Sequence, residues 1–138
     1  MYLKSVGIPE TPHDLTAHQC IVIRQNEAAY GNWRFSFGEQ VETIKVHGNL
    51  STNDGEVALN WALDGQGILM RAEWDVAKYL RSGRLIQLLE HYNTPPADVY
   101  AVYLERLQDS PRVAYFLNHL KEYLAQHVDN LVQHRPLA

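Results

Sequence analysis

The spacing of hydrophobic and polar residues changes several times along the chain, and in the first part it predicts strands. A short β-branched run at 20–24 is typical of a buried strand. At 33–37 aromatic residues alternate with polar ones, a period of two that predicts a half-buried strand. Every second position from 44 to 50 is apolar or glycine, so 41–50 is predicted to be the second arm of a hairpin.

At 51–54 the period changes from two to that of a helix. Asn53 is followed three residues later by Glu56, a spacing that resembles a capping box, and Asp54 complements the positive end of a helix dipole. Apolar residues then recur at helical spacing until Gly65, where the predicted helix ends.

The rest of the chain continues to alternate strands with helices. Before the first strand, a leader with two prolines precedes a short predicted helix at 13–18. The predictions for the second half are a strand at 67–70, a helix at 74–81, a strand at 85–89, a strand covered on both faces at 98–104, and an amphipathic helix at 111–130 capped by Ser110. This alternation predicts an α/β architecture with a mixed sheet.

Composition limits the class of protein. The chain has 138 residues, of which 46% are hydrophobic and 20% charged, as in an ordinary globular domain. Its net charge is −4, and its basic residues are scattered. A nucleic-acid-binding surface needs clustered basic residues to neutralise phosphates, so this segment is not expected to bind DNA by itself.

The same composition predicts a cytoplasmic protein with no membrane contact. The longest strongly apolar run, 99–104, has six residues, far fewer than the ~20 that span a bilayer. Prolines interrupt the first residues, so no signal peptide is expected. The single cysteine, Cys20, permits no internal disulfide, and within an apolar strand its thiol is expected to be buried with a raised pKa.

No pattern of catalytic or metal-binding residues is visible. The seven histidines include His13 with His18 and His127 with His134, and neither spacing places two imidazoles over one metal ion. No nucleophile motif or phosphate-binding loop occurs. The sequence therefore predicts no catalytic residue, no metal and no cofactor, and a protein that is not an enzyme.

One cluster offers ligand chemistry. Ser51, Thr52 and Asn53 carry short polar side chains where a predicted strand meets the start of a helix. Unpaired backbone N–H groups and the helix dipole favour an anion at such a point. Helix capping, which every helix needs, explains the same residues and is the interpretation that spacing alone favours, with ligand binding as the alternative.

Several segments together resemble the effector-binding domain of LysR-type transcriptional regulators. The resemblance extends from about Tyr2 to His127 and lies in the order of its segments more than in any single motif. The segments are Trp33-Arg34-Phe35, Gly48-Asn49-Leu50-Ser51-Thr52-Asn53-Asp54-Gly55-Glu56, Ala62-Leu63-Asp64-Gly65-Gln66-Gly67-Ile68, Leu80-Arg81-Ser82-Gly83-Arg84-Leu85, Val99-Tyr100-Ala101-Val102-Tyr103 and Ser110-Pro111-Arg112-Val113.

The resemblance implies a type 2 periplasmic-binding-protein-like fold, in which two α/β lobes enclose a small, polar or anionic effector. Residues 1–97 would form the second lobe with a leader, and 98–138 a crossing strand and a helix of the first lobe. The family's effector contacts carry over to the entrance of the second-lobe helix. The implied effector-binding residues are Ser51, Thr52 and Asn53, with Gly67 and Ile68 along the same cleft.

Relative to the family, the chain is expected to be incomplete. It lacks the helix-turn-helix, the linker helix and most of the first lobe, so DNA contact is expected only through the absent domain. We expect 98–104 and 111–130, whose partners are missing, to pair with a second copy in a homodimer or higher oligomer. The alternative is that the helix folds back onto the sheet of its own chain.

Two other functions remain open from the sequence. The chain is interpretable as a stand-alone small-molecule binding module unrelated to transcription, although such a module needs both walls of a cleft. An enzyme of unknown type is disfavoured by the lack of a catalytic set. The identity of the effector does not follow from these residues.

Overall fold

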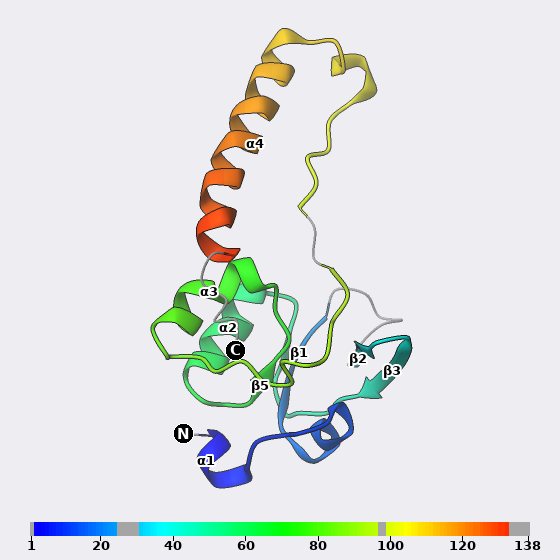
Figure 1. Cartoon of the computed structure of the whole chain (residues 1–138), viewed down its shortest axis with the longest axis vertical. Helices are drawn as coiled ribbons and strands as arrows, with labels where there is room; N and C mark the ends of the chain where they lie inside the picture. The colour runs from blue at the N-terminus through cyan, green and yellow to red at the C-terminus, as the bar shows by residue number, and fades with distance from the viewer. Residues whose placement is uncertain (1, 25–30, 97–98, 133–138) are drawn as a thin grey trace. The chain divides into compact units, whose positions relative to one another are not determined.

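The computed structural model describes residues 2–24, 31–96 and 99–132, the last five of these by their backbone only. The chain forms two compact units, Met1–Pro96 and Ala97–Ala138, which we call unit 1 and unit 2. Figure 1 shows the course of the chain within each unit.

Unit 1 is built on a three-stranded parallel sheet with β1 (Cys20–Ile23) at its centre. β4 (Ser51–Thr52) and β5 (Ile68–Leu69) pair with β1 on either side, so the order is β4-β1-β5. The predicted strands at 20–24 and 67–70 are thus confirmed. The apolar sequence of β1 suits a central strand because both of its edges and both of its faces are covered.

Two helices follow the outer strands. α2 (Gly55–Leu63) connects β4 to β5 and packs against all three strands through residues that include the buried Ala58 and Leu59. α3 (Glu73–Arg81) follows β5, as the helical spacing at 74–81 predicts. The predicted capping residue of α2, Asn53, is wrong by one position, because Asp54 is the N-cap.

An antiparallel hairpin covers one side of this core. β2 (Asn32–Phe37) pairs with β3 (Gln40–Lys45). The predicted second arm ends at Lys45 instead of continuing to residue 50, since the chain must leave the hairpin to reach the parallel sheet. The α/β class is as expected, with the parallel and antiparallel pairings in two separate sheets.

The core of unit 1 joins the hairpin to β1. Its buried residues come from the 3-10 helix η1 (Pro12–Ala17), from β1 and from both arms of the hairpin with the residue after it, and they are Leu15, Cys20, Val22, Trp33, Phe35, Ile44 and Val46. Gly48 lies where the chain crosses back toward β1, and a Cβ there would overlap the carbonyl oxygen of Cys20. A glycine at this point therefore permits a close crossing that any larger residue would push apart.

The first residues of unit 1 are tied to the sheet. α1 (Tyr2–Val6) brings the Tyr2 hydroxyl within 2.7 Å of the backbone N–H of Gln19, which donates to it, and within 3.2 Å of His18 Nδ1. The helix predicted at 13–18 is confirmed as η1. At the start of η1, the Asp14 carboxylate accepts the backbone N–H groups of Thr11 and Glu10, the two residues before the helix, at 2.9 and 3.0 Å.

The segment after α3 contains no strand at 85–89, contrary to the prediction. Its apolar residues pack without a ladder: Leu89 and Tyr92 lie against the core cluster, and Leu89 has a positive φ of 54°, which ends any extended run. Asn93 then forms an isolated antiparallel bridge with Ser36 of β2. The apolar residues that suggested a strand at 85–89 thus belong to a segment that packs against the core cluster and the hairpin.

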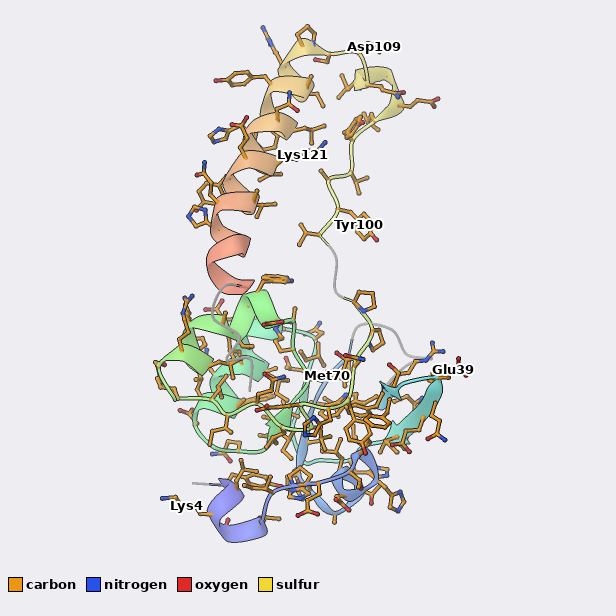
Figure 2. All side chains as sticks on the ribbon, in the orientation of Figure 1. Lys4, Glu39, Met70, Tyr100, Asp109 and Lys121 are labelled. Atoms are coloured by element: carbon orange, nitrogen blue, oxygen red, sulfur yellow. The ribbon has the colours of Figure 1, made fainter. Side chains whose placement is uncertain are left out.

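Unit 2 consists of an extended segment, the 3-10 helix η3 (Glu105–Leu107) and the long helix α4 (Pro111–Val132). α4 begins where predicted, with the Ser110 carbonyl accepting the N–H of Ala114 at 3.0 Å. The predicted strand at 98–104 is wrong for the described residues 99–104, which form no ladder and are exposed; Asp98 lies outside the described residues. The side chain of Tyr100 illustrates this exposure (Figure 2).

Candidate functional site

The polar segment 51–54 lies at the carboxyl edge of the parallel sheet. Ser51 and Thr52 pair with the last two residues of β1, and the Thr52 carbonyl accepts the N–H of Arg24 at 2.7 Å. In open α/β sheets, ligands bind outside the carboxyl ends of the strands. Three of the five residues implied as effector contacts, Ser51, Thr52 and Asn53, are therefore on the edge where a ligand is expected.

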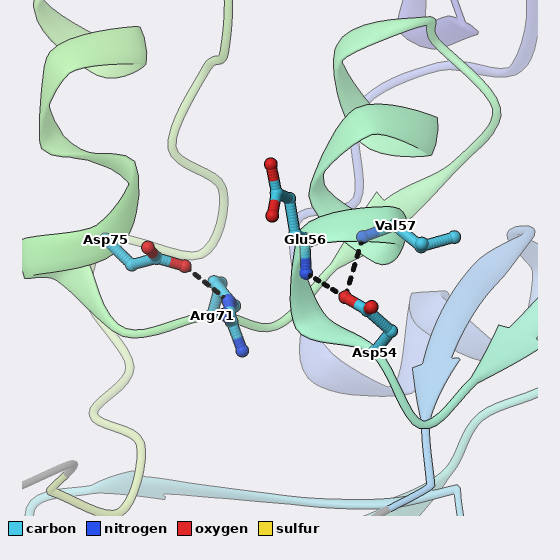
Figure 3. Close-up of polar contacts among 5 residues, drawn as sticks. All are labelled: Asp54, Glu56, Val57, Arg71 and Asp75. Carbon is cyan, nitrogen blue, oxygen red and sulfur yellow. Dashed lines mark hydrogen bonds and ion pairs between the residues drawn. The ribbon is translucent and has the colours of Figure 1, made fainter.

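Within the segment 51–54, one residue caps α2 and its neighbours do not. Asp54 Oδ1 accepts the N–H groups of Glu56 and Val57 at 2.8 and 3.2 Å, so this carboxylate caps α2 (Figure 3). The Thr52 hydroxyl oxygen accepts the N–H of Asp54 at 3.0 Å. Asn53 is exposed and is not the cap. Because Asp54 performs the capping, the side chain of Asn53 remains suited to bind a ligand.

The other two implied residues lie at the opposite end of β1. Ile68 pairs with Cys20, the first residue of β1, and its N–H donates to the Gln19 carbonyl at 2.9 Å. Ser51 pairs with Val22, two residues further along β1, which is about 7 Å along the strand from Cys20. The structure thus does not bring Gly67 and Ile68 to the carboxyl edge, where β5 instead delivers Met70 and Arg71.

Arg71 is the residue at this edge that sequence reasoning missed. Its Nε lies 2.5 Å from Asp75 Oδ2, in an ion pair whose two side chains are each 25% exposed. A Cβ on Gly55, the first residue of α2, would overlap the guanidinium group of Arg71. The i, i+4 spacing of Arg71 and Asp75 is visible in the sequence, whereas the contact with Gly55 depends on tertiary structure.

Other chemistry is not found among the described residues. In residues 2–24, 31–96 and 99–132, no three His, Cys, Asp or Glu side chains are grouped to hold a metal ion. Burial raises the pKa of the Cys20 thiol to about 12, as its apolar strand predicts, so it remains protonated and unreactive. Within the same described residues, no helix is long and apolar enough to cross a membrane.

Each unit contains a groove. One of about 370 Å³ is formed by the hairpin and Tyr92, and another of about 460 Å³ lies within unit 2 between 101–103 and α4. Neither is lined by a residue of 51–54. The hairpin groove and the polar segment 51–54 are therefore separate features of unit 1.

Comparison with known proteins gives one consistent result. Residues 2–125 match the family described as "LysR substrate binding domain". The chain is 40% identical over 129 residues to the HTH-type transcriptional regulator DmlR of Escherichia coli K12, covering 94% of this chain and 42% of that protein. It is 37% identical over 125 residues to the HTH-type transcriptional activator TtdR of the same strain, covering 91% and 40%.

A solved structure shows the same fold. The regulatory domain of CrgA, a LysR-type transcriptional regulator from Neisseria meningitidis, superposes with a TM-score of 0.74 at 25% identity, covering 88% of this chain and 59% of that one. The chain spans less than half the length of the two Escherichia coli regulators.

Proposed function

Because the chain belongs to the LysR substrate-binding domain family, we propose that it is the effector-sensing part of a LysR-type transcriptional regulator. The effector is a small polar or anionic molecule, and Ser51, Thr52 and Asn53 contact it. The observation that carries this proposal is the position of these residues at the carboxyl edge of the parallel sheet, with capping assigned to Asp54.

The two lobes of the family divide this chain near residue 97. We assign 1–97 to the second lobe and 98–138 to the crossing segment and a helix of the first lobe. The separation of the chain into units of 1–96 and 97–138 supports this assignment. The effector then lies between lobes, one of which is only partly represented in this chain.

The relatives support regulation rather than catalysis. Both Escherichia coli proteins are named as transcriptional regulators. DNA binding and a cytoplasmic location belong to the proposal for the whole regulator, since this chain matches less than half of each relative. The stand-alone binding module gains no support from relatives of this kind.

Titration of the isotopically labelled chain with a library of small metabolites, followed by backbone amide NMR, tests the proposed site. We expect saturable shifts at the amides of Ser51, Thr52 and Asn53. Asn53→Ala is expected to weaken binding, because it removes an amide side chain that can donate and accept hydrogen bonds to the ligand. The matched control is Asn60→Ala on the exposed face of α2, which should leave the affinity unchanged.

Shifts that cluster in the hairpin groove around Phe37 and Tyr92 would contradict the site. Equal losses of affinity in Asn53→Ala and Asn60→Ala would do the same, since they would indicate a general effect on α2.

We also propose that a second copy of the chain covers the apolar surface of unit 2. Val102 and Phe116 are 93% and 60% exposed, and the groove between 101–103 and α4 is almost entirely apolar. Large exposed apolar patches mark interaction sites. Sedimentation velocity over a range of concentrations should show a dimer or larger species that Phe116→Asp weakens; a strict monomer at high concentration would contradict self-association.

A further inference from the structure

The hairpin of β2 and β3 carries a groove that the proposed effector segment does not explain (Figure 1). Its volume is about 370 Å³, within the range of small-molecule sites, and it lies between the hairpin and Tyr92. We propose that this groove binds a small organic ammonium ion, with aromatic rings around the carbon chain of the ligand and Glu42 as the counter-ion. The site is separate from the segment 51–54, so it goes beyond the proposed function and does not depend on it.

Aromatic side chains line much of the groove. Phe35 is buried at 5% exposure and belongs to the core cluster, whereas Phe37, two residues further along the same face of β2, is 58% exposed. The rings of Phe37 and Tyr92 lie 5.6 Å apart between centroids, at an angle of 46°. Aromatic rings attract a cation placed over their faces and cover the carbon chain attached to it.

Backbone hydrogen bonds hold these rings in place. Gly38 has a positive φ of 60° in the two-residue turn that sets Phe37 opposite Gln40. At the other edge of β2, Ser36 and Asn93 exchange two backbone hydrogen bonds of 2.8 Å each, and they fix the position of the residue before Asn93, which is Tyr92. The fold therefore forms the groove before any ligand binds, and this lowers the entropic cost of binding.

Polar residues occupy positions of β3 where apolar residues would extend the core. Ile44 is buried in the core cluster, and the preceding residues on the same face are Glu42, opposite Phe35, and Gln40, opposite Phe37. An aromatic or β-branched side chain at either position would pair better with the aromatic residues of β2. A carboxylate and an amide oxygen that line an aromatic groove instead supply acceptors for the N–H groups of an ammonium ion.

The charge of Glu42 is available to a ligand. Within residues 2–24, 31–96 and 99–132, its carboxylate forms no ion pair and no hydrogen bond. The two cations of the hairpin strands, Arg34 and Lys45, occupy the alternate positions of their strands, which lie on the other face of the hairpin. A carboxylate beside aromatic rings, without a cation of its own, favours a positively charged ligand over a neutral or anionic one.

Butylammonium chloride and 1-butanol test this site, because they share a butyl chain and differ in charge. In amide NMR titrations of the whole chain at constant ionic strength, butylammonium should give saturable shifts at 35–42 and Tyr92, and butanol should give none at the same concentrations. Glu42→Gln should weaken butylammonium binding by ~3-fold to ~10-fold, because it removes the counter-ion from an exposed position. Phe37→Leu should weaken it by ~2-fold to ~5-fold, because leucine is apolar but has no π face.

Glu39→Gln is the matched control. It removes the same charge from an exposed residue of the hairpin turn that does not line the groove (Figure 2). The affinity for butylammonium should be unchanged in this variant. All three substitutions replace exposed side chains, and thermal unfolding of each variant separates a folding defect from a binding defect.

Equal butylammonium affinity in the wild-type chain and Glu42→Gln would overturn the site, as would equal binding of butanol or an absence of saturable shifts around Phe37 and Tyr92. If Glu42→Gln increased self-association and left the affinity unchanged, the carboxylate would serve only to protect β3 from edge-to-edge pairing. The proposed function is tested separately, by the polar and anionic molecules that are expected to shift the amides of 51–53. Hairpin shifts caused by an ammonium ion alone do not bear on that segment.

Discussion

Unit 1 and unit 2 use apolar residues in different ways. In unit 1 the apolar side chains of β1, the hairpin and η1 meet in one cluster, in which Leu15 and Cys20 are each only 1% exposed. In unit 2 no side chain between 99 and 127 is buried, and the least exposed residues form a half-buried stripe along one face of α4, namely Val113, Leu117, Leu120 and Leu124.

An apolar period does not by itself identify a core. Residues 20–23 and 99–104 are both apolar runs, yet the first is a central strand and the second forms no ladder among the described residues. A strand requires a neighbour that supplies hydrogen bonds, and the hydrophobic pattern carries no information about whether that neighbour is present.

Truncation of a buried residue in unit 1 should lower the free energy of unfolding more than any other change considered below. Ile21→Ala removes a fully buried side chain from the central strand and should reduce the free energy of unfolding by about 2–5 kcal/mol. Urea denaturation followed by tryptophan fluorescence measures this, because all three tryptophans lie in unit 1.

Phe116→Ala in unit 2 is the matched control. Its side chain is already 60% exposed, so its loss should change the unfolding of unit 1 by no more than about 0.5 kcal/mol. If the two substitutions cost the same, the contrast between the units is wrong.

A smaller effect is expected at the start of α2. Asp54→Ala removes the carboxylate that accepts two backbone N–H groups and should cost about 0.5–2 kcal/mol in the same denaturation experiment. Asn53→Ala should cost much less, because Asn53 is not the cap. If Asn53→Ala lowered the free energy of unfolding more than Asp54→Ala, the result would support Asn53 as the N-cap, as the sequence predicts.

The smallest expected effect is a dependence on pH at η1. Backbone N–H groups of Thr11 and Glu10 hydrogen-bond the Asp14 carboxylate and lower its pKa from 3.8. The folded state therefore binds this proton less readily than the unfolded state, so the contribution of Asp14 is complete above the unfolded pKa and is lost as the pH falls through the folded pKa.

Urea midpoints measured between about pH 5 and about pH 3 should fall less in Asp14→Asn than in the wild-type chain. Because Asp14 is exposed, the difference should be small. Identical pH profiles for the two proteins would show that the hydrogen bonds to Asp14 do not persist in solution.

Much of the fold follows from local pattern. The strands at β1 and β5 and the helices α3 and α4 occur where the hydrophobic period predicts them. The predicted membership of the LysR substrate-binding domain family is likewise confirmed. That prediction depended on the order of many segments, none of which is specific alone. Local rules succeed here because each of these elements has the hydrophobic period of its own sequence, whether the apolar face is buried, as in β1, or only half-buried, as in α4.

The details of the site depend on backbone conformation, strand register and tertiary contacts, which neighbouring residues in the sequence do not determine. Asn53 and Asp54 are adjacent short polar residues and equally good caps, so only the backbone decides between them. The register of β5 separates Ile68 from Ser51 along β1, and the contact of Arg71 with Gly55 joins residues sixteen apart in the chain. Such contacts arise from the packing of one element on another.

The shortness of β4 has a consequence for how such a protein can diversify. Its two residues and the exposed Asn53 are outside the buried cluster of unit 1, and each is at least partly exposed. Exchanging these side chains therefore removes little buried apolar area. A lineage can alter the chemistry offered at this edge while the hairpin and the central strand continue to maintain the fold.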